Sequence, residues 1–391
     1  MRRKLKLGII IASDLSKGLP FGGDLGFLQS IIPELHLDST VFGTVLETQT
    51  MDAQAGVLPG VQFVPTFGAK YPSAVPLRLK SLLGYARNRN RILGSDADML
   101  YVHSPEAVLP FLFGKRRLPV VFHQHGATNP MICSRFRWGS AIVFRWFYDL
   151  ALVIVHKRAD WIIAVDRLCV EQARKHGAET KTTLLPNAVD IGEFYPDAHL
   201  RRSKRKELGF QDNEVVGLFA GRLEESKRVE HAIHAASLLS TTECRFRLVV
   251  AGDGSCRSSL EQLVCQLGLQ GQVVFQGYAP HKTLRALYNA ADVLLLPSDW
   301  EGTSMVILEA LACGTPVVAR AVGGTPDVVQ TGLNGVLYEN AGEANLALAV
   351  QESLSRKWSR PQIAASVAKW SSANVARRLE QIFDALYTHH T

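Results

Sequence analysis

The sequence lacks long apolar runs, paired cysteines and low-complexity segments, and each absence excludes a class of protein. No stretch reaches the roughly 18 uncharged apolar residues of a membrane-spanning helix, so none is expected. The six cysteines form no C-x-x-C pair in a chain of 391 residues. No disulfide framework is therefore indicated, and a reducing cytoplasm fits. Residues 1–14 have a basic head and an apolar stretch too short for a signal peptide, which favours a buried first strand.

The composition predicts two globular domains rather than one. Apolar residues make up 47% of the chain and charged residues 20%, and 391 residues are too many for one ordinary core. The net charge of +7 is carried by residues 1–190, while the second half is close to neutral. A basic half can meet nucleic acid, anionic lipid or an acidic substrate, and a merely solubilising surface explains it equally well.

Short apolar runs alternate with amphipathic stretches along both halves. The predicted strands lie within residues 6–12, 38–46, 61–67, 97–103, 118–126, 160–166, 182–187, 214–222, 246–254, 272–278, 291–298, 315–320 and 334–339. This alternation is typical of parallel sheets covered by helices. The polar, charged residues 187–213, broken by Pro196, mark the boundary between two doubly wound α/β domains. Ligands of such sheets bind beyond the carboxyl ends of the strands, so a cleft between the domains is the expected site.

Residues 133–158 are rich in aromatic and basic side chains. Arg145 and Asp149 interrupt this stretch, so it is not a membrane span. An amphipathic helix resting on anionic lipid is one interpretation. A mostly buried helix of the first domain is the other, and the pattern favours it.

Two carboxylates flank the predicted start of a helix in the second half. Residues 301–309 read EGTSMVILE and follow a strand that ends near Ser298. The helix is expected to begin at Thr303 or Ser304, either of which can cap it. The backbone N–H groups left free there would belong to Ser304, Met305 and Val306. A helix start at a strand's carboxyl end is suited to a phosphate group.

Glu301 and Glu309 could both contact the ligand if the ligand is a nucleotide-sugar. Its diphosphate lies between two polyols, and carboxylates accept hydrogen bonds from vicinal hydroxyls. The spacing would then place Glu301 at the sugar and Glu309 at the ribose. On spacing alone, two solvated acids remain the simpler interpretation.

Several ordered motifs resemble one known family. Residues 301–319, EGTSMVILEALACGTPVVA, and 217–235, GLFAGRLEESKRVEHAIHA, resemble signature segments of the retaining glycosyltransferases of family four. These have the GT-B fold, two Rossmann-like domains facing each other across a cleft. The resemblance is close from about residue 184 to 340, and several motifs at the expected separations make it specific.

The resemblance implies roles for individual residues of the second half. It places Arg222 and Lys227 at the donor diphosphate, where two cations would also stabilise the leaving group. The helix start would complete the phosphate site, with the residues Gly302, Thr303, Ser304 and Met305. The nucleoside base would lie near Gly277 and Tyr278. No Asp-x-Asp pair stands where a metal ligand would be needed, so no metal and no cofactor are expected.

The first half resembles the family less closely. Gly22 and Gly23, between the first strand and first helix, would let the backbone approach the donor phosphate or the acceptor; a flexible turn is the alternative. His125, at the end of VVFHQHG, would lie near the donor sugar and help by position and charge. His103 would contact the acceptor or be structural, and His123, one alternation step from His125 on the same side of its strand, is interpreted as structural.

The sequence departs from the family pattern at two places. Arg228 follows Lys227 where the family usually has glycine, which puts a third cation near the phosphates or on the surface. Thr303 and Ser304 replace a more common aromatic–glycine pair, which would alter the donor-sugar pocket. Residues 366–391 contain an amphipathic helix that in relatives crosses back onto the first domain, with Trp370 near the crossing.

The resemblance therefore implies a hexosyltransferase that is retaining and metal-independent. The donor would be a nucleoside-diphosphate sugar and the acceptor a saccharide or lipid-linked molecule, in polysaccharide, lipopolysaccharide or glycolipid biosynthesis. Residues 1–188 would bind the acceptor, 189–365 the donor, and 366–391 would cross back. A cytoplasmic protein, peripheral on the inner face of an anionic membrane and without a nucleic-acid partner, is expected.

Three other functions are weighed against this one. A GT-B nucleotide-sugar epimerase would need further acid and base groups, and no strong set is seen. A non-catalytic nucleotide-sugar-binding protein would keep Arg222, Lys227 and Glu309 but lose acceptor-side groups, and the retained His125 argues against it. A dehydrogenase is disfavoured because neither half has a clean G-x-G-x-x-G at its first helix.

Overall fold

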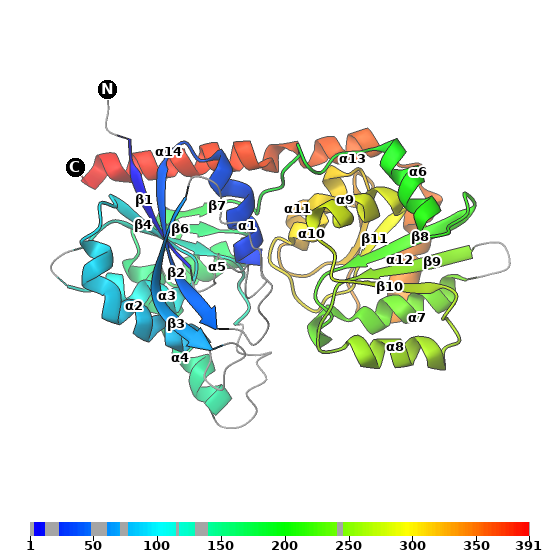
Figure 1. The fold of residues 1–391 in the computed structure, drawn as a ribbon, viewed down its shortest axis with the longest axis horizontal. Coiled ribbons are helices and arrows are strands. Elements are labelled where there is room, and N and C mark those ends of the chain that lie inside the picture. The colour runs from blue at the N-terminus through cyan, green and yellow to red at the C-terminus, as the bar shows by residue number, and fades with distance from the viewer. Residues whose placement is uncertain are drawn as a thin grey trace. The chain divides into compact units, whose positions relative to one another are not determined.

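The structure is a computed structural model of the chain. It describes residues 4–11, 23–47, 61–70, 77–114, 117–129, 140–240 and 245–390. These residues form two compact units (Figure 1). The first unit comprises Met1–Ala188 and Ser372–Thr391, and the second comprises Val189–Ser371. The C-terminal segment thus belongs to the unit that begins the chain.

The first unit is built on a parallel sheet of order β3-β2-β1-β4-β5-β6-β7. Its strands are β1 Lys6–Ile10, β2 Asp38–Glu47, β3 Gln62–Lys70, β4 Met99–Val102, β5 Val120–Gln124, β6 Trp161–Ala164 and β7 Thr182–Leu184. Its helices are α1 Gly23–Ile31, α2 Leu77–Leu93, α3 Pro105–Val108, α4 Ser140–Arg158, α5 Arg167–Lys175 and α14 Ser372–His390, with short 3-10 turns η1 Ile32–Glu34, η2 Leu109–Phe111 and η4 Glu179–Lys181.

Alternating side chains of this sheet build two cores, one on each face. Ile9 and Tyr101 belong to the core that includes residues of α1 and α14. Their neighbours Ile10 and Leu100 belong to the core that includes residues of α2, α3 and α4. Successive strand residues point to opposite faces, so each apolar run supplies both cores at once.

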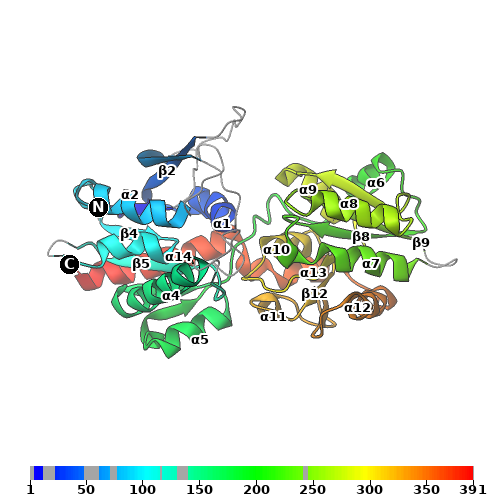
Figure 2. The ribbon, with the colours of Figure 1, turned by 90° about the horizontal axis from the view of Figure 1, so that it is seen from below.

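The second unit has a parallel sheet of order β10-β9-β8-β11-β12-β13. Its strands are β8 Glu214–Ala220, β9 Arg245–Ala251, β10 Val273–Gly277, β11 Val293–Leu296, β12 Val317–Arg320 and β13 Gly335–Tyr338. Its helices are α6 Ala198–Glu207, α7 Val229–Leu239, α8 Arg257–Gln266, α9 His281–Ala290, α10 Met305–Ala312, α11 Thr325–Val328, α12 Glu343–Ser355 and α13 Arg360–Ser366, with the turns η5 Glu225–Lys227 and η6 Ala368–Trp370. Helices cover both faces of this sheet (Figure 2).

Every strand predicted from the sequence is present, which confirms two doubly wound α/β units. The helix within residues 133–158 differs from the favoured interpretation as a mostly buried helix. The C-terminal half of α4 packs Leu152 and Val155 into the core of the first unit. In its first turns Ile142, Val143 and Trp146 are instead 71%, 62% and 66% exposed. The helix extends past the sheet there, so the core does not cover it (Figure 1).

No helix of the described part of the chain is both long and apolar enough to cross a membrane.

Candidate active site

Two of the predicted donor-site residues, Lys227 and Glu301, lie beyond the carboxyl ends of two neighbouring strands. Turn η5 follows β8 and helix α10 follows β11, and β8 and β11 are paired side by side. Parallel strands bring the loops at their carboxyl ends to one edge of the sheet. Lys227 of η5 and Glu301 of the loop before α10 therefore come together although 74 residues separate them.

Lys227 and Glu301 form an ion pair in this structure. Lys227 Nζ lies 2.7 Å from Glu301 Oε1, and Ser298 Oγ donates a second hydrogen bond of 2.7 Å to the same oxygen. The side chains are 20% and 8% exposed. The cation expected at a phosphate and the acid expected at a sugar thus neutralise each other. A bound diphosphate would interact with a lysine whose side chain is already held in place by Glu301.

Arg228, whose position the sequence leaves open, is anchored to the same loop. Its backbone is left-handed, with φ 49°, and it is the one non-glycine residue with positive φ in the described part of the chain. Its Nε donates to Asp299 Oδ2 over 2.6 Å, and Arg320 Nη1 donates to Asp299 Oδ1 over 2.9 Å. The hydrogen bond to Asp299 raises the pKa of Arg228 above its ordinary value. Asp299 therefore connects Arg320, at the end of β12, to Arg228, which directly follows the turn η5 that contains Lys227.

Arg222 is arranged differently. Its side chain is 57% exposed, and Nη1 pairs with Glu224 Oε1 of its own loop at 2.7 Å. The structure thus brings together Lys227, Arg228 and Glu301, while the contact it gives Arg222 is local.

Glu309 lies inside the second unit and is only 4% exposed. Tyr288 of α9 donates a hydrogen bond of 2.8 Å from its hydroxyl to Glu309 Oε2. Burial raises the pKa of Glu309 to about 7, while His281 and the Tyr288 hydrogen bond oppose that rise. A carboxyl with such a pKa exists in both protonation states near neutral pH, and burial with a defined partner is typical of functional acids. Sequence reasoning missed Tyr288, since no spacing pattern links it to Glu309.

Helix α10 begins at Met305, with Ser304 as its N-cap residue. The predicted position is right, but the Ser304 side chain makes no capping hydrogen bond, and Thr303 is buried at 3% exposure. The loop before the helix is packed closely by Gly323, with φ 56°, where a Cβ atom would lie 1.5 Å from the Glu301 carbonyl oxygen. Only glycine fits this approach.

The predicted base-binding residues lie at the end of β10: Gly277 is its last residue and Tyr278 follows it. Gly277 has φ 69° and its carbonyl accepts a hydrogen bond of 2.7 Å from the Gly252 N–H. Tyr278 is 63% exposed.

The first unit places three histidines close together. His103 directly follows β4, His123 lies in β5 and His125 directly follows β5. His123 and His125 stack with ring centroids 4.3 Å apart, which confirms that they share a side of the strand. Burial, with the charge of His125, lowers the pKa of His103 and of His123 well below the ordinary value. Of the predicted glycines, Gly23 begins α1 and Gly22 lies outside the described residues.

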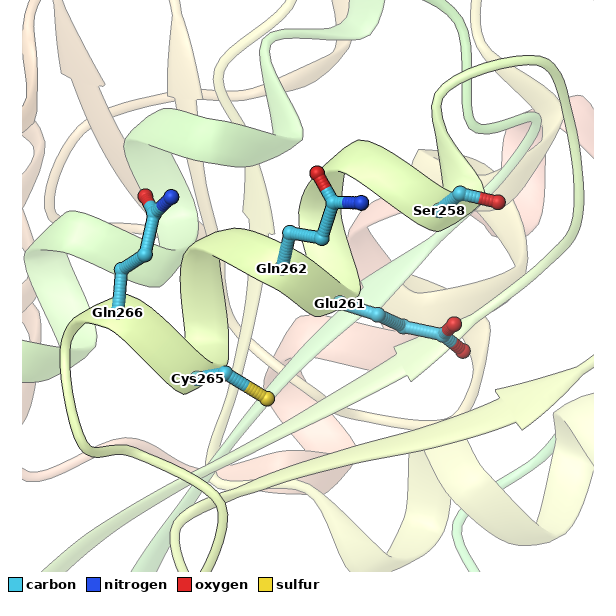
Figure 3. Close-up of a pocket in the computed structure, with 5 residues that line it drawn as sticks. All are labelled: Ser258, Glu261, Gln262, Cys265 and Gln266. Atoms are coloured by element: carbon cyan, nitrogen blue, oxygen red, sulfur yellow. The ribbon is translucent and has the colours of Figure 1, made fainter.

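A surface hollow on α8 does not resemble a phosphate site. It is lined by side chains of that one helix, Ser258, Glu261, Gln262, Cys265 and Gln266. Figure 3 shows these side chains along the helix, with one acid and no cation among them. None of them is a predicted site residue.

Two family models match the chain. The model described as Glycosyl transferases group 1 matches residues 201–370, and the model described as Glycosyltransferase Family 4 matches residues 40–193. The two matches lie one after the other and together take in most of both units.

Curated relatives carry names of the same class. An uncharacterized glycosyltransferase of Methanocaldococcus jannaschii is 34% identical over 52% of this chain and 54% of its own length. A D-inositol 3-phosphate glycosyltransferase of Geodermatophilus obscurus is 38% identical over 46% of this chain and 42% of its own. The chain thus spans about half the length of these two relatives. An alpha-D-kanosaminyltransferase of Streptomyces kanamyceticus is 28% identical over 75% of this chain and 77% of its own.

Solved structures share the fold over nearly the whole chain. Sucrose-phosphate synthase of Thermosynechococcus elongatus superposes with a TM-score of 0.78 at 20% identity, covering 99% of this chain and 100% of that chain. Anabaena HepE in complex with UDP-glucose superposes with a TM-score of 0.74 at 20% identity, covering 97% and 100%. With both units matched by models of one class of enzyme, the chain belongs to the group 1, family 4 glycosyltransferases and has the GT-B fold.

Proposed function

We propose that this chain transfers a hexosyl group from a nucleoside-diphosphate sugar to a saccharide or lipid-linked acceptor, with retention and without a catalytic metal. The contact between Lys227 and Glu301, at the carboxyl ends of β8 and β11 and next to the start of α10, carries the proposal. A cation and a helix N-terminus suit a diphosphate, and the adjacent acid suits sugar hydroxyls.

Each group in the second unit then has a role in the departure of the diphosphate. Lys227, Arg222 and the first N–H groups of α10 stabilise negative charge as it develops on the leaving oxygen. Glu301 holds donor-sugar hydroxyls, and its negative charge favours an oxocarbenium-like transition state. Glu309 accepts from the ribose hydroxyls, and Tyr278 lies against the base near Gly277. Residues 189–365 are in this proposal the donor-binding part of the chain.

In the first unit, residues 1–188 bind the acceptor, and Gly22 and Gly23 would let the backbone approach the donor phosphate or the acceptor. His125 positions the donor sugar near its anomeric carbon, and residues 366–391 cross back to the first unit. HepE was solved with UDP-glucose, so UDP-sugars come first among the donors to be tested.

Donor hydrolysis without an acceptor tests this function. The protein is incubated with a panel of UDP-, GDP- and ADP-sugars, and the released nucleoside diphosphate is measured. Release from one donor, lost in Glu309→Ala and kept in Glu352→Ala, is the expected result, because Glu352 is an exposed acid of α12 paired with Arg356. If no donor is hydrolysed and calorimetry detects no donor binding, the proposal is wrong.

We also propose that the first turns of α4 contact an anionic membrane, where a lipid-linked acceptor would be found. Ile142, Val143, Trp146 and Leu150 are exposed apolar residues of one helix, and the exposed Arg145 lies among them. Such a combination suits the interface of an anionic bilayer. Sedimentation with phosphatidylglycerol vesicles at low salt should exceed that with phosphatidylcholine vesicles, and Trp146→Ser should reduce it. Equal sedimentation with both lipids would contradict the proposal.

A further inference from the structure

The three histidines of the first unit form a cluster with no assigned ligand. His103 and His125 directly follow the neighbouring strands β4 and β5, whose register pairs Val102 with Phe122, and His123 lies two residues before His125. Residues two apart in a strand point to the same side, so the topology delivers three imidazoles to one place. Among the residues that the structure describes, no acid or cysteine belongs to this cluster.

The ring nitrogens of the cluster converge. One nitrogen from each histidine can be chosen so that all three lie within 4.8 Å of one another. His103 Nδ1 and His125 Nε2 are 2.8 Å apart. The rings of His103 and His125 stack at 5.1 Å between centroids.

One buried nitrogen in this cluster, His123 Nε2, lacks a partner among the described residues and belongs to a residue that is 0% exposed. His103 Nε2 is also unpaired, but His103 turns its other nitrogen, Nδ1, toward His125, so only His123 Nε2 bears on a ligand of the cluster. Burying a polar atom without a partner is unfavourable, so such atoms point to a ligand. The two observations, convergence and the unpaired nitrogen, are independent of each other.

Tyr101 orients one of these rings. Its hydroxyl contacts His123 Nδ1 at 2.5 Å, and both residues are fully buried. When His123 donates its Nδ1–H to the phenolic oxygen, the lone pair of Nε2 is left for a metal ion. Histidine ligands usually carry such a hydrogen bond on the second nitrogen.

We propose that His103, His123 and His125 bind one first-row transition-metal ion, with Zn²⁺ as the ion that suits the set best. Imidazole is a preferred ligand of Zn²⁺, and three protein ligands leave a fourth position for water or an anion. Zn–N bonds of about 2.0–2.1 Å in a tetrahedron place the nitrogens about 3.3 Å apart. The 2.8 Å pair therefore opens by about half an ångström when an ion replaces the proton between the rings.

Titration with the metal alone tests the site. Apo protein is titrated with ZnCl₂ by calorimetry and with CoCl₂ in a spectrophotometer, in a buffer that does not bind metals. We expect one ion per chain and the intense visible bands of tetrahedral Co²⁺. His103→Gln and His125→Gln should each weaken binding at least tenfold, as loss of a ligand does.

Two controls keep the result interpretable. The double variant His389→Gln, His390→Gln removes another pair of histidines, at the end of α14, and should bind like the wild type. Circular dichroism of each variant without metal shows whether it is folded, and Mg²⁺, which prefers oxygen ligands, should not bind the cluster. Binding that survives His103→Gln and is lost in the C-terminal variant, or no binding at all, overturns the proposal; the unpaired nitrogen would then face buried water.

Binding of a metal ion to the histidine cluster should also affect donor hydrolysis, an expectation that rests on the proposed function. An ion on His125 removes this side chain from the donor sugar, so Zn²⁺ should inhibit donor hydrolysis and a chelator should restore it. The metal titrations do not depend on transfer. Metal binding with neither donor hydrolysis nor donor binding would contradict only the proposed transferase, and donor hydrolysis without metal binding would contradict only the metal site.

Discussion

At the scale of single residues, Glu309 should make stability depend on pH. Its folded-state pKa is raised to about 7 from 4.5. Between these values the unfolded chain releases the proton while the folded chain keeps it. Stability is therefore lost as pH rises through this window, by up to about 3 kcal/mol. In urea unfolding at pH 4.5 and pH 8, Glu309→Gln should gain about that much relative to the wild type at the higher pH. A difference independent of pH would contradict the buried, protonated acid.

Arg228 combines an unfavourable backbone with favourable side-chain contacts. Its left-handed conformation is one that glycine adopts freely, and its guanidinium holds Asp299. Arg228→Ala and Arg228→Gly both lose the ion pair, but only alanine keeps the backbone strain. We expect Arg228→Gly to be more stable than Arg228→Ala by about 1 kcal/mol in urea unfolding. Equal stability would mean that the backbone relaxes to another conformation once the ion pair is gone.

At the scale of elements, Gly323 should be essential to the loop that carries Glu301. Gly323→Ala adds a methyl group 1.5 Å from the Glu301 carbonyl, at a φ of 56°. Gly268→Ala is the matched control, because Gly268 has φ 68° and open space around its Cβ position. The control should cost about 1 kcal/mol and Gly323→Ala at least about 2 kcal/mol. If Glu301 contacts the donor, calorimetry should show donor binding at least tenfold weaker in Gly323→Ala alone.

The strands could be predicted from the sequence because most of them are short apolar runs whose side chains are buried, as in β4 and β11. Helix α6 was missed, since residues 187–213 read as a polar connection. Two residues in the sequence indicate this helix. Asp197 caps its start by accepting a hydrogen bond from the Leu200 N–H, and Gly209 lies just past its end. Ion pairs fix this helix to the rest of the unit: Arg201 lies 2.5 Å and Arg205 3.2 Å from the carboxylate of Asp292. Hydrophobic periodicity does not detect such a helix.

The site could be predicted only where a motif carried it. The resemblance to a family identified Lys227 and Glu301 as site residues, but it did not predict that these two residues form an ion pair with each other. Their partners come from separate elements: Ser298 follows β11, Arg320 ends β12 and Tyr288 lies in α9. The order of the strands in the sheet sets these contacts, and no spacing along the chain encodes it.

At the scale of the whole molecule, the described residues of the two units share no hydrophobic core. One of the two cores of the first unit includes residues from both ends of the chain, because Val375, Leu379 and Phe383 of α14 join Leu7 and Ile9 of β1. Phe383 is fully buried, with its ring 5.2 Å from that of Tyr101. A helix that follows the second unit in sequence is thus required to complete the first.

Separate cores predict separate unfolding transitions in calorimetry. Phe383→Ala removes a buried ring from the first unit and should cost about 3–5 kcal/mol there, which lowers the Tm of that transition by roughly 10 °C. Phe246→Ala is the matched variant of the second unit, since Phe246 of β9 is equally buried in the other core. Each substitution should move one transition and leave the other in place. If both transitions moved together in both variants, the units would unfold as one cooperative body, and α14 would stabilise more than the core it completes.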